Sequence, residues 1–214
     1  MRDLYIIGSG GFGKEVAWLV ERINKENKLW NLKGFIDDDE NLLGLDINGI
    51  KVKGNTEYLN SLGKDVWAIC AVGNAKAREN IISRLNNISF ATLIDPSVII
   101  SNKVKIGEGT IICAGSIITV DIEIGRHVII NLDCTIGHDD IIKDYVTIYP
   151  SVNVSGNVIV EEKCEIGTGT QIIQGKNIVS ECIIGAGAVV VKDLVSPGTY
   201  VGIPAINIER KEKK

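Results

Sequence analysis

Hydrophobic residues in the second half of the chain recur at every sixth position. From Ile94 to Val190, each sixth residue is isoleucine or valine, and the register never slips. A period of six matches neither an α-helix, with 3.6 residues per turn, nor an amphipathic strand with a period of two. It predicts short flat sides that turn a corner every six residues, with the β-branched side chain pointing inward.

A second column, four residues after the first, holds mostly small or β-branched residues. Cys134, Cys164 and Cys182 belong to this column, and we interpret them as interior filler, whereas Asp140 and Lys176 interrupt it. Three sides close one triangular coil of about eighteen residues, which predicts a parallel β-helix of nearly six coils. At roughly 4.8 Å per coil it is about 27 Å long. The unbroken register leaves no inserted loop, so any site must be built from the coils themselves.

Residues 1–93 follow a different pattern, in which short apolar strands alternate with helical spacing. Strands are expected at 4–7, 34–36 and 66–72, and helices over 14–23 and from about 75 to 85. This alternation predicts a small parallel α/β sheet of about four strands, roughly half of a dinucleotide-binding Rossmann fold. We therefore expect a Rossmann-like domain over 1–93 and a β-helix domain over 94–214, with a short C-terminal tail.

Composition and charge narrow the classes of partner. The chain has 214 residues, is 45% apolar and carries a net charge of −4, which argues against a nucleic-acid partner. No apolar stretch is long enough for a membrane span. Five cysteines without C-x-x-C spacing argue against disulfides or a zinc site and favour the cytoplasm. The basic cluster Arg210, Lys211, Lys213 and Lys214 is expected to be a solvated tail.

The first strand is followed by the glycine motif Gly8-x-Gly10-x-x-Gly13, which opens a helix. Glycines there let the backbone approach a diphosphate, and the helix N-terminus offers amide donors. Asp37 and Asp38 end the next strand, and Gly73-Asn74 ends a later one, so all reach the same sheet edge. We favour a nucleotide diphosphate joined to a sugar. A tight turn without ligand and an NAD site stay open as alternatives.

The chain contains only two histidines, His127 and His138. His138 lies two residues after an inward isoleucine, which places it at a corner facing outward. Asp139 follows it, and a carboxylate beside an imidazole can fix its tautomer and raise its basicity. His127 has no such neighbour and is expected to be a surface residue. Two histidines cannot build the three-histidine zinc site of a β-helical carbonic anhydrase, so no metal is expected.

Four motifs accompany the hexapeptide column in a fixed order along the chain: Gly8-Ser-Gly-Gly-Phe-Gly13, Gly34-Phe-Ile-Asp-Asp38, Ala71-Val-Gly-Asn74 and Ile136-Gly-His-Asp139. In this combination and order they resemble bacterial sugar acyltransferases. This family includes UDP-4-amino-sugar N-acetyltransferases and the sialic acid O-acetyltransferase type. The ending Ile184-Gly-Ala-Gly-Ala-Val-Val-Val-Lys-Asp193 and Val201-Gly-Ile-Pro-Ala205 is similar to that of hexapeptide acyltransferases. The resemblance covers nearly the whole chain and implies a left-handed β-helix.

The resemblance also implies an activity: transfer of an acetyl group from acetyl-CoA to an amine or hydroxyl of a nucleotide-linked sugar, within cell-surface polysaccharide biosynthesis. A homotrimer would hold acetyl-CoA between neighbouring prisms. His138 would be the general base, tuned by Asp139, with no covalent intermediate. The implied sugar-nucleotide contacts are Gly10, Gly11, Phe12, Asp37, Asp38 and Gly73, and the implied acetyl-CoA contacts are Thr168 and Ala186.

Two departures from the family pattern concern the acceptor site. Thr147 stands where many members carry a second histidine that donates to the acetyl carbonyl, and its hydroxyl is assigned to the acetyl-CoA contacts. Phe12 replaces a common histidine of the glycine loop. The sugar, its nucleotide and the choice of N or O acylation stay open. Two other functions also stay open: a non-catalytic trimeric scaffold that binds a nucleotide sugar, and an NAD-binding enzyme.

Overall fold

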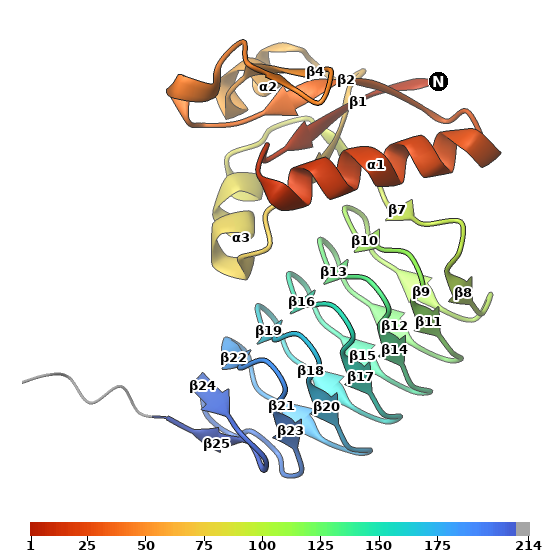
Figure 1. Ribbon diagram of the computed structural model, residues 1–214, viewed down its shortest axis with the longest axis vertical. Coiled ribbons are helices and arrows are strands. Elements are labelled where there is room, and N and C mark those ends of the chain that lie inside the picture. The colour runs from red at the N-terminus through yellow and green to blue at the C-terminus, as the bar shows by residue number, and fades with distance from the viewer. Residues whose placement is uncertain (209–214) are drawn as a thin grey trace, which may run out of the picture. The chain divides into compact units, whose positions relative to one another are not determined.

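The computed structural model describes residues 1–208, and the basic cluster of Arg210, Lys211, Lys213 and Lys214 lies outside this range. The chain forms two compact units (Figure 1). One comprises Met1–Pro96 with Glu108–Thr110, and the other comprises Ser97–Gly107 with the chain from Ile111 onward.

The first unit is a six-stranded sheet with the order β3-β4-β2-β1-β5-β6. All its neighbouring strands are parallel except β3 and β4, which form an antiparallel hairpin. The elements are β1 (Arg2–Ile7), α1 (Gly11–Glu26), β2 (Trp30–Ile36), η1 (Glu40–Leu42), β3 (Asp46–Ile47), β4 (Ile50–Gly54), α2 (Thr56–Ser61), β5 (Trp67–Cys70), α3 (Ala75–Ser83) and β6 (Ser89–Phe90). The parallel α/β sheet predicted for this half is confirmed.

The sheet is larger than the four strands predicted. The extra hairpin turns at Asn48 and Gly49, with φ angles of +52° and +82°. Asn-Gly between two isoleucines is a strong hairpin signal, because both turn positions need a positive φ. Helix α2 also escaped prediction, since six residues are too few to show a helical period.

The hydrophobic core of the first unit follows from the pattern of its strands and helices. Helix α1 buries Val16, Leu19, Val20 and Ile23, the residues that the helical spacing singled out. On β1, Leu4 and Ile6 are fully buried and Tyr5 and Ile7 nearly so, as expected for a central parallel strand covered on both faces. A rigid central strand gives the loop that follows Ile7 a defined position at the edge of the sheet.

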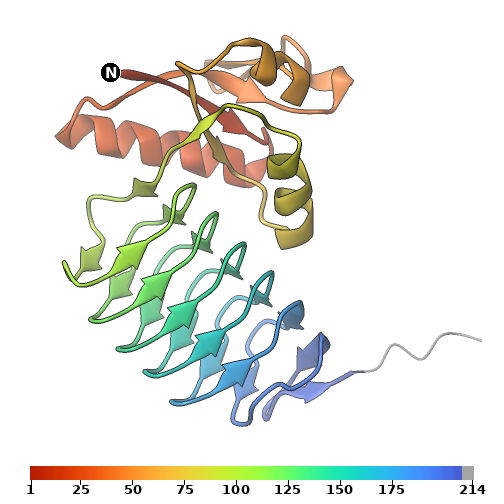
Figure 2. The same ribbon diagram turned by 180° about the vertical axis from the view of Figure 1, so that it is seen from behind.

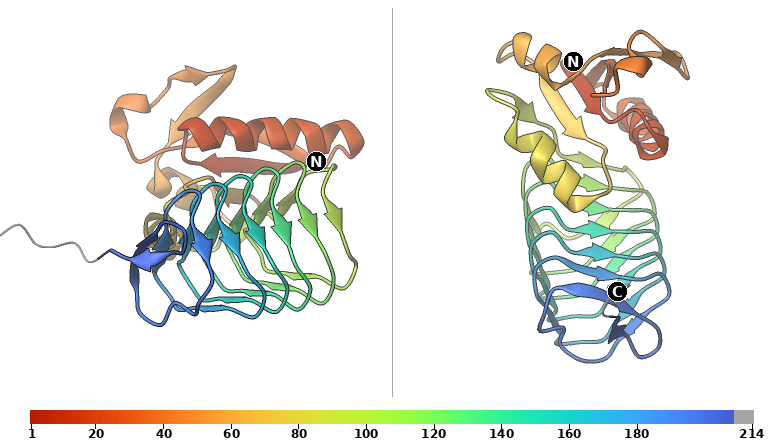
Figure 3. Two further views of the ribbon diagram at one scale, coloured as in Figure 1. Left: turned by 60° about the horizontal axis from the view of Figure 1, so that its bottom comes forward. Right: turned by 90° about the vertical axis from the view of Figure 1, so that its left-hand side faces the viewer.

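The second unit is the predicted parallel β-helix, and its rungs stack with almost no irregularity (Figures 2 and 3). Strands 18 residues apart pair in parallel, as Ile112 does with Ile130 and Ile118 with Ile136. The chain thus closes one three-sided coil for every three hexapeptides.

The strands of the β-helix form three sheets. Strand β7 (Leu93–Ile94) belongs to the first unit. The first sheet of the second unit contains β10 (Ile111–Ile112), β13 (Ile129–Ile130), β16 (Thr147–Ile148), β19 (Glu165–Ile166), β22 (Cys182–Ile184), β24 (Gly198–Val201) and β25 (Ile206–Asn207). The second contains β8 (Ile99–Ile100), β11 (Ile117–Ile118), β14 (Thr135–Ile136), β17 (Asn153–Val154), β20 (Gln171–Ile172) and β23 (Val189–Val190). The third contains β9 (Lys105–Ile106), β12 (Glu123–Ile124), β15 (Ile141–Ile142), β18 (Ile159–Val160) and β21 (Asn177–Ile178).

From the second coil onward the column of every sixth residue is buried as predicted, whereas Ile94, Ile100 and Ile106 of the first coil are half-buried. In the column of every sixth residue, each side chain from Ile112 to Val190 is at most 4% exposed. Cys134, Cys164 and Cys182 are fully buried, and all five cysteines are free, which confirms their interpretation as interior filler. Burial raises the pKa of Cys134 to about 11, so this thiol stays protonated.

The prediction for His127 was wrong. His127 is only 3% exposed, and its ring stacks on that of Tyr145 with centroids 5.3 Å apart. Both residues occupy the left-handed turn position, with φ angles of +53° and +61°, in adjacent coils. The same corner of successive coils therefore places the two aromatic rings face to face, which the sequence pattern of a single hexapeptide did not reveal.

Candidate active site

His138 lies at the outermost point of the turn that joins β14 to β15. The turn spans residues 137–140 and is closed by the left-handed conformation of Asp139, whose φ is +60°. Other corners of the β-helix carry the same conformation at six-residue intervals, as at Asp133 and Tyr145. At this corner the residue that precedes the left-handed position is exposed, and it is a histidine.

The imidazole of His138 is oriented from two sides. Its Nδ1 lies 2.7 Å from Oδ2 of Asp139, and the two side chains are 53% and 60% exposed. When Nδ1 carries the proton and donates to Asp139, Nε2 keeps a lone pair and can accept a proton from a substrate. The ring also lies over Gly156 of the next coil, where a Cβ would come within 2.5 Å of Nε2.

Asp140 ends the same turn, and its side chain is fully buried inside the prism. Its Oδ2 accepts a hydrogen bond from the Gly137 amide at 3.1 Å, and its Oδ1 accepts one from the Val158 amide at 2.8 Å. Burial raises the pKa of Asp140 to about 7, against the opposing effect of these two amides and of His138.

The residues assigned to acetyl-CoA lie elsewhere on the prism. Thr168 and Ala186 are exposed at the corners after β19 and β22, which form a different edge from the His138 corner. Thr147 is on β16 and is 1% exposed. One protomer therefore does not bring Thr168 and Ala186 together with His138.

The glycine loop of the first unit lies where the carboxyl ends of β1, β2 and β5 coincide, since Ile7 pairs with both Ile36 and Cys70. Gly8 has a φ of +94°. A Cβ on Gly13 would come within 2.1 Å of the Gly8 carbonyl oxygen, so helix α1 packs onto the loop as only glycine allows. Space around Gly10 and Gly11 is open within 4 Å, which leaves their backbone approachable by a ligand. Phe12 is half-buried.

The two aspartates after β2 have different surroundings. Oδ2 of Asp37 accepts hydrogen bonds from the Ser9 amide at 2.9 Å and hydroxyl at 2.6 Å, so Asp37 shapes the glycine loop. Asp38 accepts from the Thr56 amide at 3.0 Å and from the Arg84 guanidinium at 2.6 Å. Partial burial opposes its ionisation, but these donors outweigh it and lower the pKa of Asp38. Both oxygens of Asp38 are thus engaged within the unit.

A pocket of about 220 Å³ opens beside this edge of the sheet. Asp37 is the predicted residue in its lining. Asp39, at the end of the same predicted strand, also lines it. The other lining residues come from segments that sequence patterns missed: Glu40, Leu43, Lys53, Gly54, Asn55 and Tyr58. An apolar and aromatic wall with a few polar groups is typical of a site for a planar ring with hydrogen-bonding edges.

Arg78 is another residue that sequence patterns missed. It is fully buried on α3, and its Nη1 donates to the carbonyl oxygens of Val72 at 2.6 Å and Gly73 at 3.0 Å. Asn74 caps the same helix by accepting from the Ala77 amide. Gly73, a predicted sugar-nucleotide contact, is therefore held in place by a buried guanidinium. No local signal marks an arginine in a polar helix as buried.

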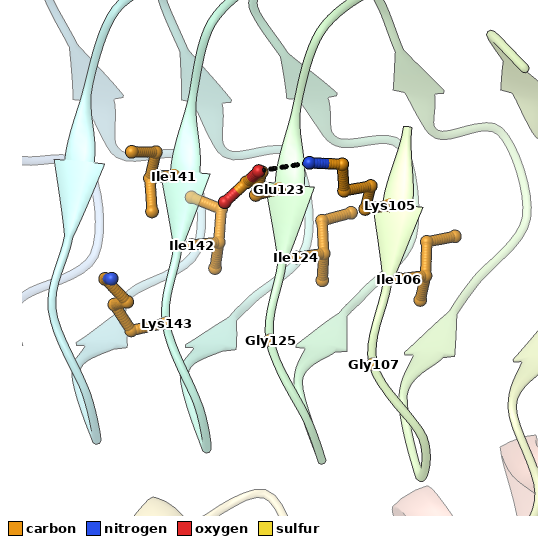
Figure 4. Close-up of a pocket in the computed structure, with 9 residues that line it drawn as sticks. All are labelled: Lys105, Ile106, Gly107, Glu123, Ile124, Gly125, Ile141, Ile142 and Lys143. Atoms are coloured by element: carbon orange, nitrogen blue, oxygen red, sulfur yellow. Dashed lines mark hydrogen bonds and ion pairs between the residues drawn. The ribbon is translucent and has the colours of Figure 1, made fainter. Parts of the chain in front are cut away.

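A further hollow of about 290 Å³ lies on the sheet of β9, β12 and β15 (Figure 4). Its floor is apolar, and Lys105 and Glu123 form an ion pair of 2.7 Å across neighbouring strands. None of the predicted site residues lines it. Within residues 1–208, no cluster of three potential ligands could hold a metal ion, and no helix is long and apolar enough to cross a bilayer.

Comparisons with known proteins place the chain in a family. Residues 3–85 match the family model described as the PglD N-terminal domain. UDP-N-acetylbacillosamine N-acetyltransferase of Bacillus subtilis (strain 168) is 38% identical over 113 residues, which cover 51% of this chain and only 50% of that relative.

Solved structures extend the similarity to both units. The acetyltransferase domain of PglB from Neisseria gonorrhoeae FA1090, in complex with acetyl coenzyme A, has a TM-score of 0.88 and 31% identity, covering 97% of this chain and 99% of that one. A histidine-to-asparagine variant of perosamine N-acetyltransferase from Caulobacter crescentus, in complex with CoA and GDP-perosamine, has a TM-score of 0.84 and 27% identity, covering 97% of each chain. WeeI from Acinetobacter baumannii AYE has a TM-score of 0.85 and 29% identity, covering 97% of this chain and 100% of that one.

The family model covers most of the α/β unit, and the match to PglB covers both the α/β unit and the hexapeptide-repeat left-handed β-helix. These matches run through nearly the full length of the chain. This chain belongs to the hexapeptide-repeat sugar acetyltransferases.

Proposed function

We propose that the protein transfers the acetyl group of acetyl-CoA to the amine of a nucleotide-linked amino sugar, with His138 as the general base. The observation that carries this proposal is the exposed His138 at a β-helix corner, with Nδ1 on Asp139 and Nε2 available. PglB was solved with acetyl coenzyme A and the perosamine enzyme with CoA and GDP-perosamine, which supports both substrate classes.

The reaction needs one proton acceptor and a fixed approach of two ligands. The neutral amine attacks the thioester carbon, a C–N bond forms, and the C–S bond breaks to release CoA. Nε2 of His138 takes the proton that the nitrogen loses, and Asp139 stabilises the imidazolium; the proton then passes to the CoA thiolate. Base catalysis of this kind contributes about 10²–10⁴-fold, and positioning of the two ligands contributes the rest.

No acyl-enzyme intermediate is part of this mechanism. All five cysteines are buried and free, so no thiol is presented to the thioester. Unpaired cysteines also fit a reducing compartment, and we place the reaction in the cytoplasm, as a step of cell-surface polysaccharide biosynthesis. Thr147 stands in the place of a second histidine, but it is 1% exposed, so we do not assign its hydroxyl to the acetyl oxygen.

The nucleotide half of the acceptor would bind along the edge of the α/β sheet. Gly10 and Gly11 offer open backbone to the diphosphate, with Phe12 and Gly73 beside it, and the α1 N-terminus supplies amides. The base would enter the pocket lined by Leu43, Asn55 and Tyr58. Asp37 would act mainly by holding the Ser9 amide, and Asp38 by anchoring α2.

The active enzyme would be a homotrimer. Thr168 and Ala186 lie on a different edge of the prism from His138, so a neighbouring copy is needed to complete an acetyl-CoA groove. Light scattering coupled to size exclusion should give three times the mass of the chain, and a monomer with full activity would contradict this.

The decisive experiment is mass spectrometry of nucleotide amino sugars, both UDP- and GDP-linked, after incubation with acetyl-CoA. We expect one acceptor to gain one acetyl group, and His138→Ala to lower kcat by about 10²–10⁴-fold with nearly unchanged acetyl-CoA affinity. Asp139→Asn should also lower kcat. Asp133→Asn is the matched control, because Asp133 occupies the same left-handed position at another corner.

Two outcomes would overturn the proposal. Equal turnover by wild type and His138→Ala would remove His138 from the mechanism. Absence of acetyl-CoA binding in isothermal titration would favour a scaffold that only binds the nucleotide sugar.

A further inference from the structure

The turn that presents His138 is tied down from inside the prism by a carboxyl group. Asp140 occupies an interior position that aliphatic residues fill in the neighbouring coils, among them Ile122 and Val158, both fully buried. Burying a carboxyl group in such a column has a free-energy cost, because its hydration is lost. The cost is limited by the two hydrogen bonds that Asp140 accepts.

These two hydrogen bonds reach both turns that define the position of the imidazole. The Gly137 amide, which binds Oδ2, immediately precedes His138 in the chain. The Val158 amide, which binds Oδ1, closes the turn that contains Gly156, the residue beneath the His138 ring. One side chain therefore links the turn that carries the base to the surface on which the base lies.

The fold itself does not need a carboxyl group at this position. In the first coil, the equivalent turn closes through its own backbone, because the Val104 amide donates to the Ser101 carbonyl oxygen at 3.3 Å. The Gly137 amide also donates to the Val154 carbonyl oxygen at 2.9 Å, independently of Asp140. A valine at position 140 would thus leave the coil able to form.

We infer that Asp140 is a positioning residue for His138: its buried carboxyl group holds the 137–140 turn so that Nδ1 stays on Asp139 and Nε2 faces the acceptor. This inference rests on the proposed function, because it assigns Asp140 a part in the same reaction. Supporting side chains of this kind fix a reacting group within the narrow range of geometry that catalysis needs.

The charges around Asp140 belong mainly to the same turn. His138 favours its ionised form and Asp139 opposes it. Asp121 lies in the preceding turn, residues 155–158 carry no charge, and Lys176 occupies the same interior column two coils further on. Burial places the pKa of Asp140 at about 7, so the strength of its hold on the two amides changes with pH near neutrality.

The test compares Asp140→Val and Asp140→Asn with Ser116→Ala in the full-length protein. Ser116 is a matched control, because its buried hydroxyl accepts from the Cys134 amide, 18 residues ahead, just as Asp140 accepts from Val158. We expect Asp140→Val to lower kcat about tenfold with the acetyl-CoA KM within about twofold. Asp140→Asn keeps one acceptor oxygen and should lower kcat by a smaller factor. Ser116→Ala should keep the wild-type kcat.

A second readout is independent of turnover. With only two histidines, the ¹⁵N resonances of the His138 ring are assigned by their loss in His138→Gln. We expect the Nδ1–H tautomer in the wild type and a mixture of tautomers in Asp140→Val, whereas a purely structural residue would change the melting temperature alone.

The outcomes separate the two proposals. Wild-type kcat together with an unchanged tautomer in Asp140→Val would overturn the role of Asp140. If no acceptor is acetylated by the wild type, the proposed function fails, while the tautomer measurement still decides whether Asp140 positions the ring.

Discussion

The two units of this protein build their sites by different rules. In the β-helix each residue repeats the surroundings of the residue 18 positions earlier, as the pairing of Ile118 with Ile136 shows. Asp140 interrupts this repeat next to His138 and Asp139, the residues proposed here to act on the substrate. The α/β unit has no repeat, and its candidate site forms because β1, β2 and β5 end at one edge of the sheet.

This contrast predicts how far the effect of a substitution extends in each unit. A repeat confines the effect of a change to adjacent coils, since each coil contacts mainly its neighbours. In a crossover sheet, one loop contacts elements that are far apart in sequence, as Ser9 contacts Asp37. Variants of the two units should therefore differ in how far their effects spread.

The largest effect is expected from Gly13→Ala in the glycine loop. Its Cβ would come within 2.1 Å of the Gly8 carbonyl oxygen, so α1 must move away from the loop. We expect at least about 100-fold weaker nucleotide-sugar binding in calorimetry, with acetyl-CoA binding unchanged. Gly10→Ala has open space and should weaken binding without lowering the melting temperature. Equal behaviour of the two variants would contradict a loop shaped by helix packing.

Truncation of a core isoleucine should come next. Ile148→Ala in the β-helix and Ile6→Ala on β1 each remove a fully buried side chain, and each should destabilise its own unit by about 2–5 kcal/mol. Hydrogen exchange should rise only in coils next to Ile148 in the first variant, and across most of the sheet in the second. A uniform rise in hydrogen exchange over both units would contradict the proposed difference between them.

Asp140→Asn should change how stability depends on pH. The pKa of Asp140 is about 7 in the folded protein, well above that of an unfolded aspartate. Between about pH 4 and 7 the unfolded chain has released this proton and the folded protein keeps it, so wild-type stability falls as pH rises. The variant does not lose stability in this way. Relative to the wild type, its free energy of unfolding should rise by on the order of a few kcal/mol from pH 4 to 8. If urea unfolding gave the wild type and the variant free energies that change in parallel with pH, this would argue against an ionisable group in the interior.

The smallest effect is expected at the exposed pair of Lys105 and Glu123. Their side chains are 80% and 56% exposed, and solvent screens their attraction. We expect Lys105→Ala to leave the melting temperature unchanged in low and high salt. A clear loss would indicate that surface charge ladders, as well as interior columns, hold the coils in register.

Much of the fold was predictable because it depends on periodic patterns. The six-residue spacing of isoleucine and valine predicted the coils, and the buried cysteines followed from the same register. The predicted α1 helix and its buried face also match. The β3–β4 hairpin was missed although Asn48-Gly49 signals it, and α2 was missed because it is short.

The candidate site was only partly predictable. His138 at an outward corner follows from the hexapeptide register, and its contact with Asp139 follows from their adjacency. The stacking of His127 on Tyr145, the engagement of Asp38 by Arg84 and the burial of Arg78 do not, since each depends on residues that only folding brings together.

The amino-acid pattern specifies the β-helix, its interior columns and the corner that carries the histidine, because a strict period leaves one way to bury the apolar residues. The contacts that hold this corner arise from the packing of one coil on the next. The bonds from Gly137 and Val158 to Asp140, and the closeness of Gly156 to the His138 ring, join residues of adjacent coils. Their distances depend on how the coils stack, and a one-dimensional pattern carries no distance between its repeats.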